Sequence, residues 1–130
     1  MVGKLVLVDT SIWVEFFLGK NEAVRGVTPL MEADRIAICG AVLQEVLQGA
    51  RDARAFETLK TRLALWHHEA EQLEDFIRAA EMYARLRWRG LTVPPSDCLI
   101  AALAQRCDMM IYAHDKDFER IPRLNLYFPP

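Results

Sequence analysis

Five acidic residues stand at positions where a carboxylate could serve chemistry rather than only face solvent. Asp9 directly follows an apolar run, and Glu45 lies in a mostly apolar segment. Asp97 follows a serine, and Asp115 and Asp117 flank a lysine. Carboxylates that converge repel one another and raise some of their pKa values, and a divalent cation removes this conflict. Because hard oxygen ligands select Mg²⁺ or Mn²⁺, the pattern predicts an acidic metal site if the fold brings these side chains together.

Short buried strands are the elements that must position these acids. Residues 5–8 are all apolar, as in a strand buried on both faces, and we interpret residues 35–39, which are apolar after Arg35, and residues 109–113 as further strands. We interpret residues 66–68 as a further short strand and residues 124–127 as a last edge strand. Strands that alternate with longer amphipathic segments indicate an α/β fold. We therefore expect a central, mainly parallel sheet of about four to five strands with helices on both faces.

Helical spacing of apolar residues predicts six helices between these strands. The first follows Thr10 or Ser11 as its N-cap, and the others cover residues 22–33, 41–49, 51–65, 69–89 and 97–106. Pro29 should kink or interrupt the second helix. Ser96 should cap the last helix, which is apolar nearly all round and is therefore expected to pack deep inside the protein.

The longest predicted helix, over residues 69–89, has a regular apolar pattern. Its apolar positions recur at helical spacing, at Leu73, Phe76, Ile77, Ala80 and Ala84. We expect this pattern to give the helix an apolar face.

The acids share a predicted location at one edge of the sheet. Asp9 and Asp115 each follow a strand, and the carboxyl ends of parallel strands form the edge at which α/β proteins bind ligands. Each acid also has a structural explanation. Asp97 complements a helix dipole, Glu45 suits a solvated helix face, and Asp115 with Asp117 suits a turn.

Length and composition limit the function further. The chain has 130 residues, of which 52% are hydrophobic and 26% charged, as expected for one globular domain over residues 1–130. The formal net charge of -2 gives no whole-molecule attraction to nucleic acid. No apolar run is long enough for a membrane span or a signal-peptide core, so we expect a cytoplasmic protein. Cys39, Cys98 and Cys107 are expected to be reduced thiols rather than disulfides or a zinc site.

Four segments together resemble the motifs of PIN-domain nucleases, and more narrowly those of VapC-type toxins from toxin-antitoxin pairs. They are residues 8–13, Glu45 in its short helix, residues 96–102 and residues 114–120. The resemblance extends over essentially the whole chain. It implies a central parallel sheet, an acidic Mg²⁺ or Mn²⁺ site and endonucleolytic cleavage of RNA. It also implies a cognate antitoxin as partner, in a homodimer or a toxin-antitoxin hetero-oligomer.

The resemblance also implies a role for each acid. Asp9 and Asp97 match the principal metal-holding aspartates, and Glu45 matches the glutamate of the short helix. Asp115 and Asp117 match the acids of the last motif, of which family members keep one or the other. All five are thus catalytic candidates, and Asp9, Glu45, Asp97 and Asp115 are the candidate metal ligands.

Three hydroxyl side chains beside these acids match positions where hydrogen bonds would hold the carboxylates in place. They are Thr10, Ser11 and Ser96. Metal-activated water would then attack the phosphodiester and leave a 5′-phosphate and a 3′-hydroxyl. Glu45 or an acid of the last motif would accept the proton of that water, and the sequence does not select between them.

Substrate contact is predicted at Arg85, Arg87 and Arg89, which alternate with Leu86 and Trp88. The alternative is that these cations only complement the C-terminal end of a helix dipole.

The first predicted helix is apolar around most of its surface, and its aromatic residues belong either to the core or to a groove. They are Trp13, Phe16 and Phe17. The resemblance implies that such a groove, lined by early helices, would seat the antitoxin.

Other functions with similar chemistry fit the sequence less well. A receiver-type phosphoacceptor domain requires an adjacent acidic pair early in the chain. An aspartyl phosphatase requires an acid two residues after Asp9, where Ser11 stands. The alternative left open is a catalytically silent, acidic metal- and partner-binding module of the same fold.

Overall fold

A parallel sheet of four strands runs through the centre of the computed structural model, which describes residues 3–130. The strand order is β3-β2-β1-β4, and each neighbouring pair is parallel. The strands are β1 (Val6–Val8), β2 (Ile36–Cys39), β3 (His67–Glu69) and β4 (Met110–Tyr112). Every residue of β1 and β2 is buried, which confirms the prediction of central strands covered on both faces.

The edge strand predicted at residues 124–127 is reduced to a single parallel bridge between Ile111 and Leu126. Ile111 donates its N–H to the carbonyl of Asn125 at 2.9 Å, and Tyr127 donates to the carbonyl of Ile111 at 2.8 Å. Prolines at positions 122, 129 and 130 border this segment, and proline has no N–H to extend a strand ladder.

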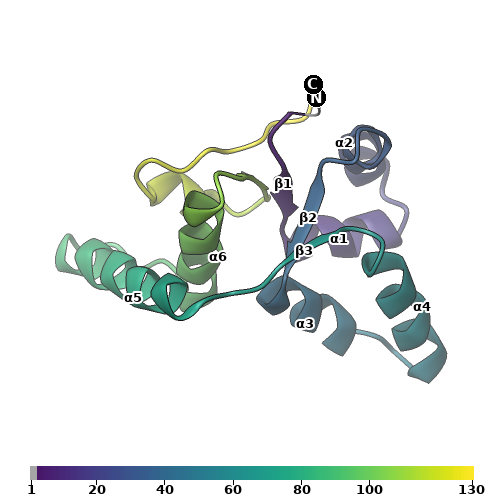
Figure 1. Ribbon diagram of the computed structural model, residues 1–130, viewed down its shortest axis with the longest axis horizontal. Helices are drawn as coiled ribbons and strands as arrows, with labels where there is room; N and C mark the ends of the chain where they lie inside the picture. The colour runs from purple at the N-terminus through teal and green to yellow at the C-terminus, as the bar shows by residue number, and fades with distance from the viewer. Residues whose placement is uncertain (1–2) are drawn as a thin grey trace.

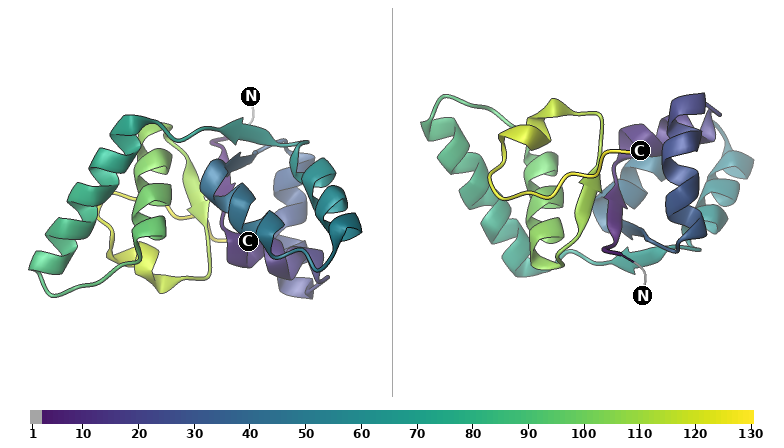
Figure 2. Two further views of the ribbon diagram at one scale, coloured as in Figure 1. Left: turned by 90° about the horizontal axis from the view of Figure 1, so that it is seen from below. Right: turned by 90° about the horizontal axis from the view of Figure 1, so that it is seen from above.

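Helices cover both faces of the sheet, as expected. Figure 1 shows α1 to α4 on one side of the strands and α5 with α6 on the other, and Figure 2 shows the same division from two further directions. The helices are α1 (Thr10–Phe17), α2 (Asn21–Glu32), α3 (Gly40–Gln48), α4 (Ala53–Leu63), α5 (Leu73–Trp88) and α6 (Pro95–Arg106). A 3₁₀ helix, η1 (Lys116–Arg120), follows β4.

Two helix predictions were wrong in detail. Of the two effects predicted for Pro29, a kink or an interruption, the interruption was wrong, because α2 continues past it to Glu32; Pro29 is exposed, so water can solvate the carbonyl that loses its hydrogen bond. The long helix begins at Leu73 rather than at residue 69, because Glu69 still belongs to β3 and pairs with Cys39.

The apolar positions predicted along α5 include several that face solvent. Leu73 is 77% exposed and Ile77 is 62% exposed, whereas Asp75 and Ala79 are buried. The deep packing predicted for α6 is confirmed, since Ile100 to Ala104 are all buried.

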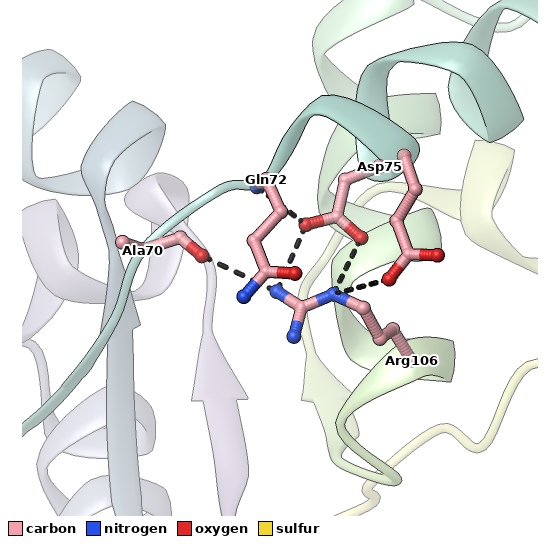
Figure 3. A network of polar contacts seen from close by, with 5 residues as sticks. Ala70, Gln72, Asp75 and Arg106 are labelled. Carbon is pink, nitrogen blue, oxygen red and sulfur yellow. Dashed lines mark hydrogen bonds and ion pairs between the residues drawn. The ribbon is translucent and has the colours of Figure 1, made fainter.

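A buried ion pair explains why α5 turns Asp75 inward (Figure 3). Arg106, in the last turn of α6, donates from Nε to Asp75 Oδ1 at 2.8 Å and from Nη2 to Asp75 Oδ2 at 2.9 Å. Gln72 donates its N–H to the same carboxylate at 2.9 Å, and the carbonyl of Ala70 accepts from Arg106 at 3.2 Å. The arginine lowers the pKa of Asp75. The Asp75–Arg106 ion pair thus fixes the rotation of α5 about its axis relative to α6, the helix that carries Asp97.

The three cysteines are free, as predicted, and Cys39 and Cys98 are buried. Burial raises the pKa of Cys39 to about 12 and that of Cys98 to about 11, so both remain thiols at neutral pH. None of the helices within residues 3–130 combines the length and hydropathy required to cross a bilayer.

Candidate functional site

Three of the predicted acids form one cluster. Asp97, Asp115 and Asp117 each place a carboxylate oxygen within 4.8 Å of the other two. Asp97 comes from the first turn of α6, and the other two come from the segment that follows β4. The topology accounts for this meeting, because α6 begins at the same edge of the sheet at which β4 ends.

The segment after β4 is shaped by its own acids. Asp115 is the N-cap of η1, and its Oδ1 accepts the N–H of Asp117 at 2.8 Å. Arg120 lies one turn later, with Nη1 3.5 Å from Asp117 Oδ1. Asp115 therefore has a structural role in the turn in addition to its place in the cluster.

Asp9 lies at the same edge, where β1 ends. Its N–H donates to the carbonyl of Tyr112 at 2.9 Å, which joins the ends of β1 and β4. Asp9 itself occupies the N-cap position of α1 but does not cap it with its side chain. The predicted capping by Thr10 or Ser11 was wrong. Ser11 instead donates from Oγ to Asp9 Oδ2 at 3.3 Å, which orients that carboxylate.

Asp97 carries the strongest electrostatic perturbation of the cluster. Its side chain is 8% exposed, and its Oδ2 has no hydrogen-bond partner within residues 3–130. Burial, together with the carboxylates of Asp115, Asp9 and Asp117, raises the pKa of Asp97 to about 8. A buried carboxylate oxygen without a partner, surrounded by like charges, is the arrangement that a cation stabilises.

Asp9 and Glu45 complete the acidic surface without belonging to the closest cluster. Burial raises the pKa of Asp9, partly offset by its hydrogen bonds, and the charges of Glu45 and Asp115 raise it further. Glu45 is exposed on α3. The structure thus brings Asp97, Asp115 and Asp117 into direct proximity and Asp9 within electrostatic range of them, whereas Glu45 acts on Asp9 alone among these acids.

Glu71 holds the helix that carries Glu45, a contact that no sequence pattern predicts. Its Oε1 accepts the N–H of Gly40 at 3.0 Å and its Oε2 that of Ala41 at 2.7 Å. The carboxylate thus satisfies free N–H groups at the positive end of the α3 dipole. A Cβ added at position 40 would lie 2.8 Å from Glu71 Oε1, so a larger residue there would displace this carboxylate from the two N–H groups.

A second unpredicted contact links α1 to the segment after β4. His114 Nε2 lies 2.7 Å from Glu15 Oε2, although the two residues are 99 positions apart. The pair tethers the loop that carries Asp115 to α1, which begins beside Asp9.

The hydroxyl side chains predicted beside the acids differ in their surroundings. Ser11 bonds to Asp9 as described, and Thr10 Oγ1 is buried with no hydrogen-bond partner in the described chain. Ser96 is exposed and does not cap α6. The N-cap is Pro94, and Pro95 occupies the first helical position. A proline suits that position because its missing N–H would be unpaired there anyway.

The predicted arginine cluster is divided between two faces of α5. Arg85 and Arg89 line a hollow between α5, α6 and the segment that follows η1. Arg87 lies outside that hollow, with Cζ 6.0 Å from the ring centroid of Tyr83.

A separate groove lies between α1, α3 and α4. Phe17 lines it, with Arg62 Cζ 4.9 Å from its ring centroid, and the exposed side chains of Val14 and Leu18 add apolar surface. Trp13 is fully buried and stacks on Phe17 with ring centroids 5.7 Å apart, so it supports the groove from beneath.

The sequence profile of the PIN domain family matches residues 6–124. Ribonuclease VapC11 from Mycobacterium tuberculosis is 40% identical to the chain over 126 residues, which cover 92% of this chain and 93% of that protein. The chain belongs to the PIN domain family and, within it, to the VapC proteins.

Solved structures agree with this PIN domain assignment at the level of the fold. A toxin-antitoxin complex from Klebsiella pneumoniae superimposes with a TM-score of 0.70 at 23% identity, covering 96% of this chain and 99% of that chain. VapC20 from Mycobacterium tuberculosis, described as a sarcin-ricin loop cleaving toxin, has a TM-score of 0.74 at 17% identity, with coverages of 96% and 99%.

Proposed function

We propose that the chain is the toxin of a toxin-antitoxin pair and acts as a metal-dependent endoribonuclease. The observation that carries the proposal is the meeting of Asp97, Asp115 and Asp117, with Asp9 close enough to raise the pKa of Asp97 and Glu45 close enough to raise that of Asp9. Family membership supports it, because VapC11 is named a ribonuclease and VapC20 is described as a sarcin-ricin loop cleaving toxin.

The donor set fits Mg²⁺ or Mn²⁺. Asp9, Glu45, Asp97 and Asp115 would hold the cation, since all offer hard carboxylate oxygens and Asp97 Oδ2 is buried without a partner in residues 3–130. When bound, the cation supplies positive charge that reconciles the carboxylates with an anionic phosphodiester and favours ionisation of water. Ser11 would keep the Asp9 carboxylate oriented through its hydrogen bond.

The remaining acids would handle the proton released by the attacking water. Glu45 is exposed on α3, and Asp117 is half-buried in the cluster, so both have access to solvent. Either carboxylate, or that of Asp115, would serve as the base in water attack. In-line attack by water would leave a 5′-phosphate and a 3′-hydroxyl.

Cleavage of mixed cellular and transfer RNA tests the proposal. The purified, antitoxin-free chain is compared with Asp97→Asn and with Asp34→Asn, an exposed aspartate in left-handed backbone that asparagine also adopts. We expect discrete fragments with 5′-phosphates from the wild type and Asp34→Asn, and none with Asp97→Asn or with EDTA. Fragments that persist in Asp97→Asn, or that end in 2′,3′-cyclic phosphates, would refute the mechanism.

The groove between α1, α3 and α4 is the proposed antitoxin site. It combines apolar surface from Val14, Phe17 and Leu18 with cations from Arg54 and Arg62, and Glu45 lies along its lining. An amphipathic antitoxin segment would therefore lie beside the acidic site. A basic side chain at its end would then compete with the cation for the acids.

The exposed side of α5 is the proposed contact between two copies of the chain. Leu73, Phe76 and Ile77 are 77%, 52% and 62% exposed, and Phe76 and Ile77 lie about one helical turn after Leu73. Clustered apolar side chains of this kind mark interaction surfaces. Loss of dimer in Phe76→Glu, measured by sedimentation, would support this assignment, and an unchanged oligomer would refute it.

A further inference from the structure

A hollow of about 510 Å³ lies between α5, α6 and the segment after η1. Four arginines line it: Arg78, Arg85 and Arg89 from α5, and Arg123 from the opposite wall. Figure 2 shows this C-terminal segment, in yellow, passing in front of α6 in the right view, with α5 further back.

The arginines of α5 share one face of the helix. Arg78, Arg85 and Arg89 are spaced by seven and four residues, which brings them onto one stripe. This stripe differs from the exposed apolar stripe of Leu73 and Ile77, so the hollow stays accessible when that apolar face is covered.

The opposite wall is held in place by its backbone. Gln105 donates from Nε2 to the carbonyl of Pro122 at 3.0 Å and to that of Arg123 at 3.5 Å. Arg123 adopts left-handed backbone with φ of 60°. The side chain of Arg123 is therefore presented from a fixed segment rather than from a free tail.

The hollow has an excess of positive charge. Of its four arginines, only Arg85 has a carboxylate within 4 Å among residues 3–130, and that ion pair with Glu81 is exposed at 3.3 Å. A neighbouring hollow of about 260 Å³ shares Arg78, Gln105 and Arg123. Its acid, Asp108, is paired with Lys4 at 3.0 Å. Guanidinium groups match phosphate oxygens in geometry as well as in charge.

The hollow lies close to the acidic cluster along the chain. Arg123 follows Asp117 by six residues, which span at most about 20 Å even when fully extended. The acidic cluster repels polyanions and the whole chain has a net charge of -2, so a polyanion requires cations nearby.

We propose that this arginine hollow binds the phosphates of RNA that flank the cleaved bond. The inference rests on the proposed ribonuclease function. It favours RNA over an acidic protein segment because four arginines line the hollow, whereas Leu86 and Ile121 are buried and only Met82 and Pro122 among the apolar lining residues are accessible. A protein partner would be expected to find exposed apolar anchors.

Fluorescence anisotropy with labelled single-stranded RNA of mixed sequence tests the proposal over a range of salt. All variants are made in the Asp97→Asn background, so that the RNA stays intact. Each phosphate contact contributes about 0.7 to the slope of log affinity against log salt concentration for single strands. At 0.1 M salt, relative to 1 M, this corresponds to about fivefold in affinity per contact. We expect Arg78→Ala/Arg123→Ala to lower affinity about 25-fold and the slope by about 1.4.

Two controls separate charge from position and from folding. Arg25→Ala removes an equivalent exposed cation from α2, on the other side of the sheet, and should leave affinity nearly unchanged. Arg78→Lys/Arg123→Lys keeps the charge and should retain most of the slope. Equal loss in Arg25→Ala, or no loss in the alanine pair, would overturn the proposal.

The same variants with Asp97 intact separate this inference from the proposed function. Cleavage that is normal in the alanine pair would overturn the hollow as an RNA site and leave the nuclease standing. No cleavage by any preparation would refute the nuclease, whereas the anisotropy result would still decide the inference. If a glutamate-rich peptide binds through these arginines while RNA binding does not depend on them, the hollow is a protein-docking surface and the proposal is wrong.

Discussion

Arg106→Met should destabilise the fold far more than the same substitution in an exposed ion pair. The Arg106 side chain is 17% exposed and pairs with Asp75, which is 0% exposed. Removing the arginine leaves a buried carboxylate without its cation, which typically costs about 3–5 kcal/mol. Arg85→Met removes an ion pair whose side chains are 68% and 62% exposed, and should cost less than about 1 kcal/mol.

The decrease in the free energy of unfolding caused by Arg106→Met should depend on pH. In the wild type the pKa of Asp75 is lowered by Arg106, so its ionised form stabilises the fold above the unfolded pKa, and this stabilisation is lost as the pH falls through the lowered value. In Arg106→Met, burial instead favours the neutral carboxyl. The difference between wild type and variant should therefore be large at pH 7 and shrink toward pH 4.

Urea denaturation at both pH values, followed by circular dichroism, measures these differences. The double variant Asp75→Leu/Arg106→Met should regain much of the loss, because no buried charge remains. The reasoning would be refuted if Arg106→Met lowered the free energy of unfolding no more than Arg85→Met does. It would also be refuted if the decrease in Arg106→Met were equal at pH 7 and pH 4.

Three further perturbations test the packing and the site. Without added metal, Asp97→Asn should melt at a higher temperature than the wild type at pH 7. The pKa of Asp97 is raised to about 8 in the folded protein, so wild-type stability falls as the pH rises from about 4 toward 8. Equal melting temperatures of the two proteins across this pH range would contradict this prediction. Gly26→Ala should lower the free energy of unfolding, measured by urea denaturation, by about 1–3 kcal/mol, because the added Cβ would overlap Tyr112 Oη. Adding Tyr112→Phe should restore part of this loss. An unchanged free energy of unfolding in Gly26→Ala would contradict the close packing of α2. Glu71→Gln should slow RNA cleavage without unfolding the chain, because the N-terminus of α3 loses its charged cap and Glu45 shifts. An unchanged cleavage rate would show that the Glu71 carboxylate does not position the site.

The placement of the acids at strand ends could be predicted because it depends on local pattern. The apolar runs before Asp9 and Asp115 identify parallel strands, and such strands necessarily share an edge. The deep position of α6 could likewise be predicted from its apolar residues, but the approach of Asp97 to the sheet edge depends on the orientation of that helix, which the apolar pattern alone does not determine.

The rotation of α5 and the support of α3 could not be predicted, because both depend on partners far along the chain. Asp75 meets Arg106 and Gly40 meets Glu71 across 31 residues in each case. The apolar periodicity of α5 favoured Leu73 and Ile77 as packing positions, but the buried ion pair turned them outward. Helix propensity contains no information about such long-range pairings.

Calorimetric titration of Mn²⁺ tests most directly whether the acidic cluster is a metal site. We predict binding to the wild type and to Asp34→Asn, and its loss in Asp97→Asn, whose buried carboxylate oxygen is replaced by an amide. Equal binding by all three proteins would contradict the account, because the cation would then lie away from the cluster formed by Asp97, Asp115 and Asp117.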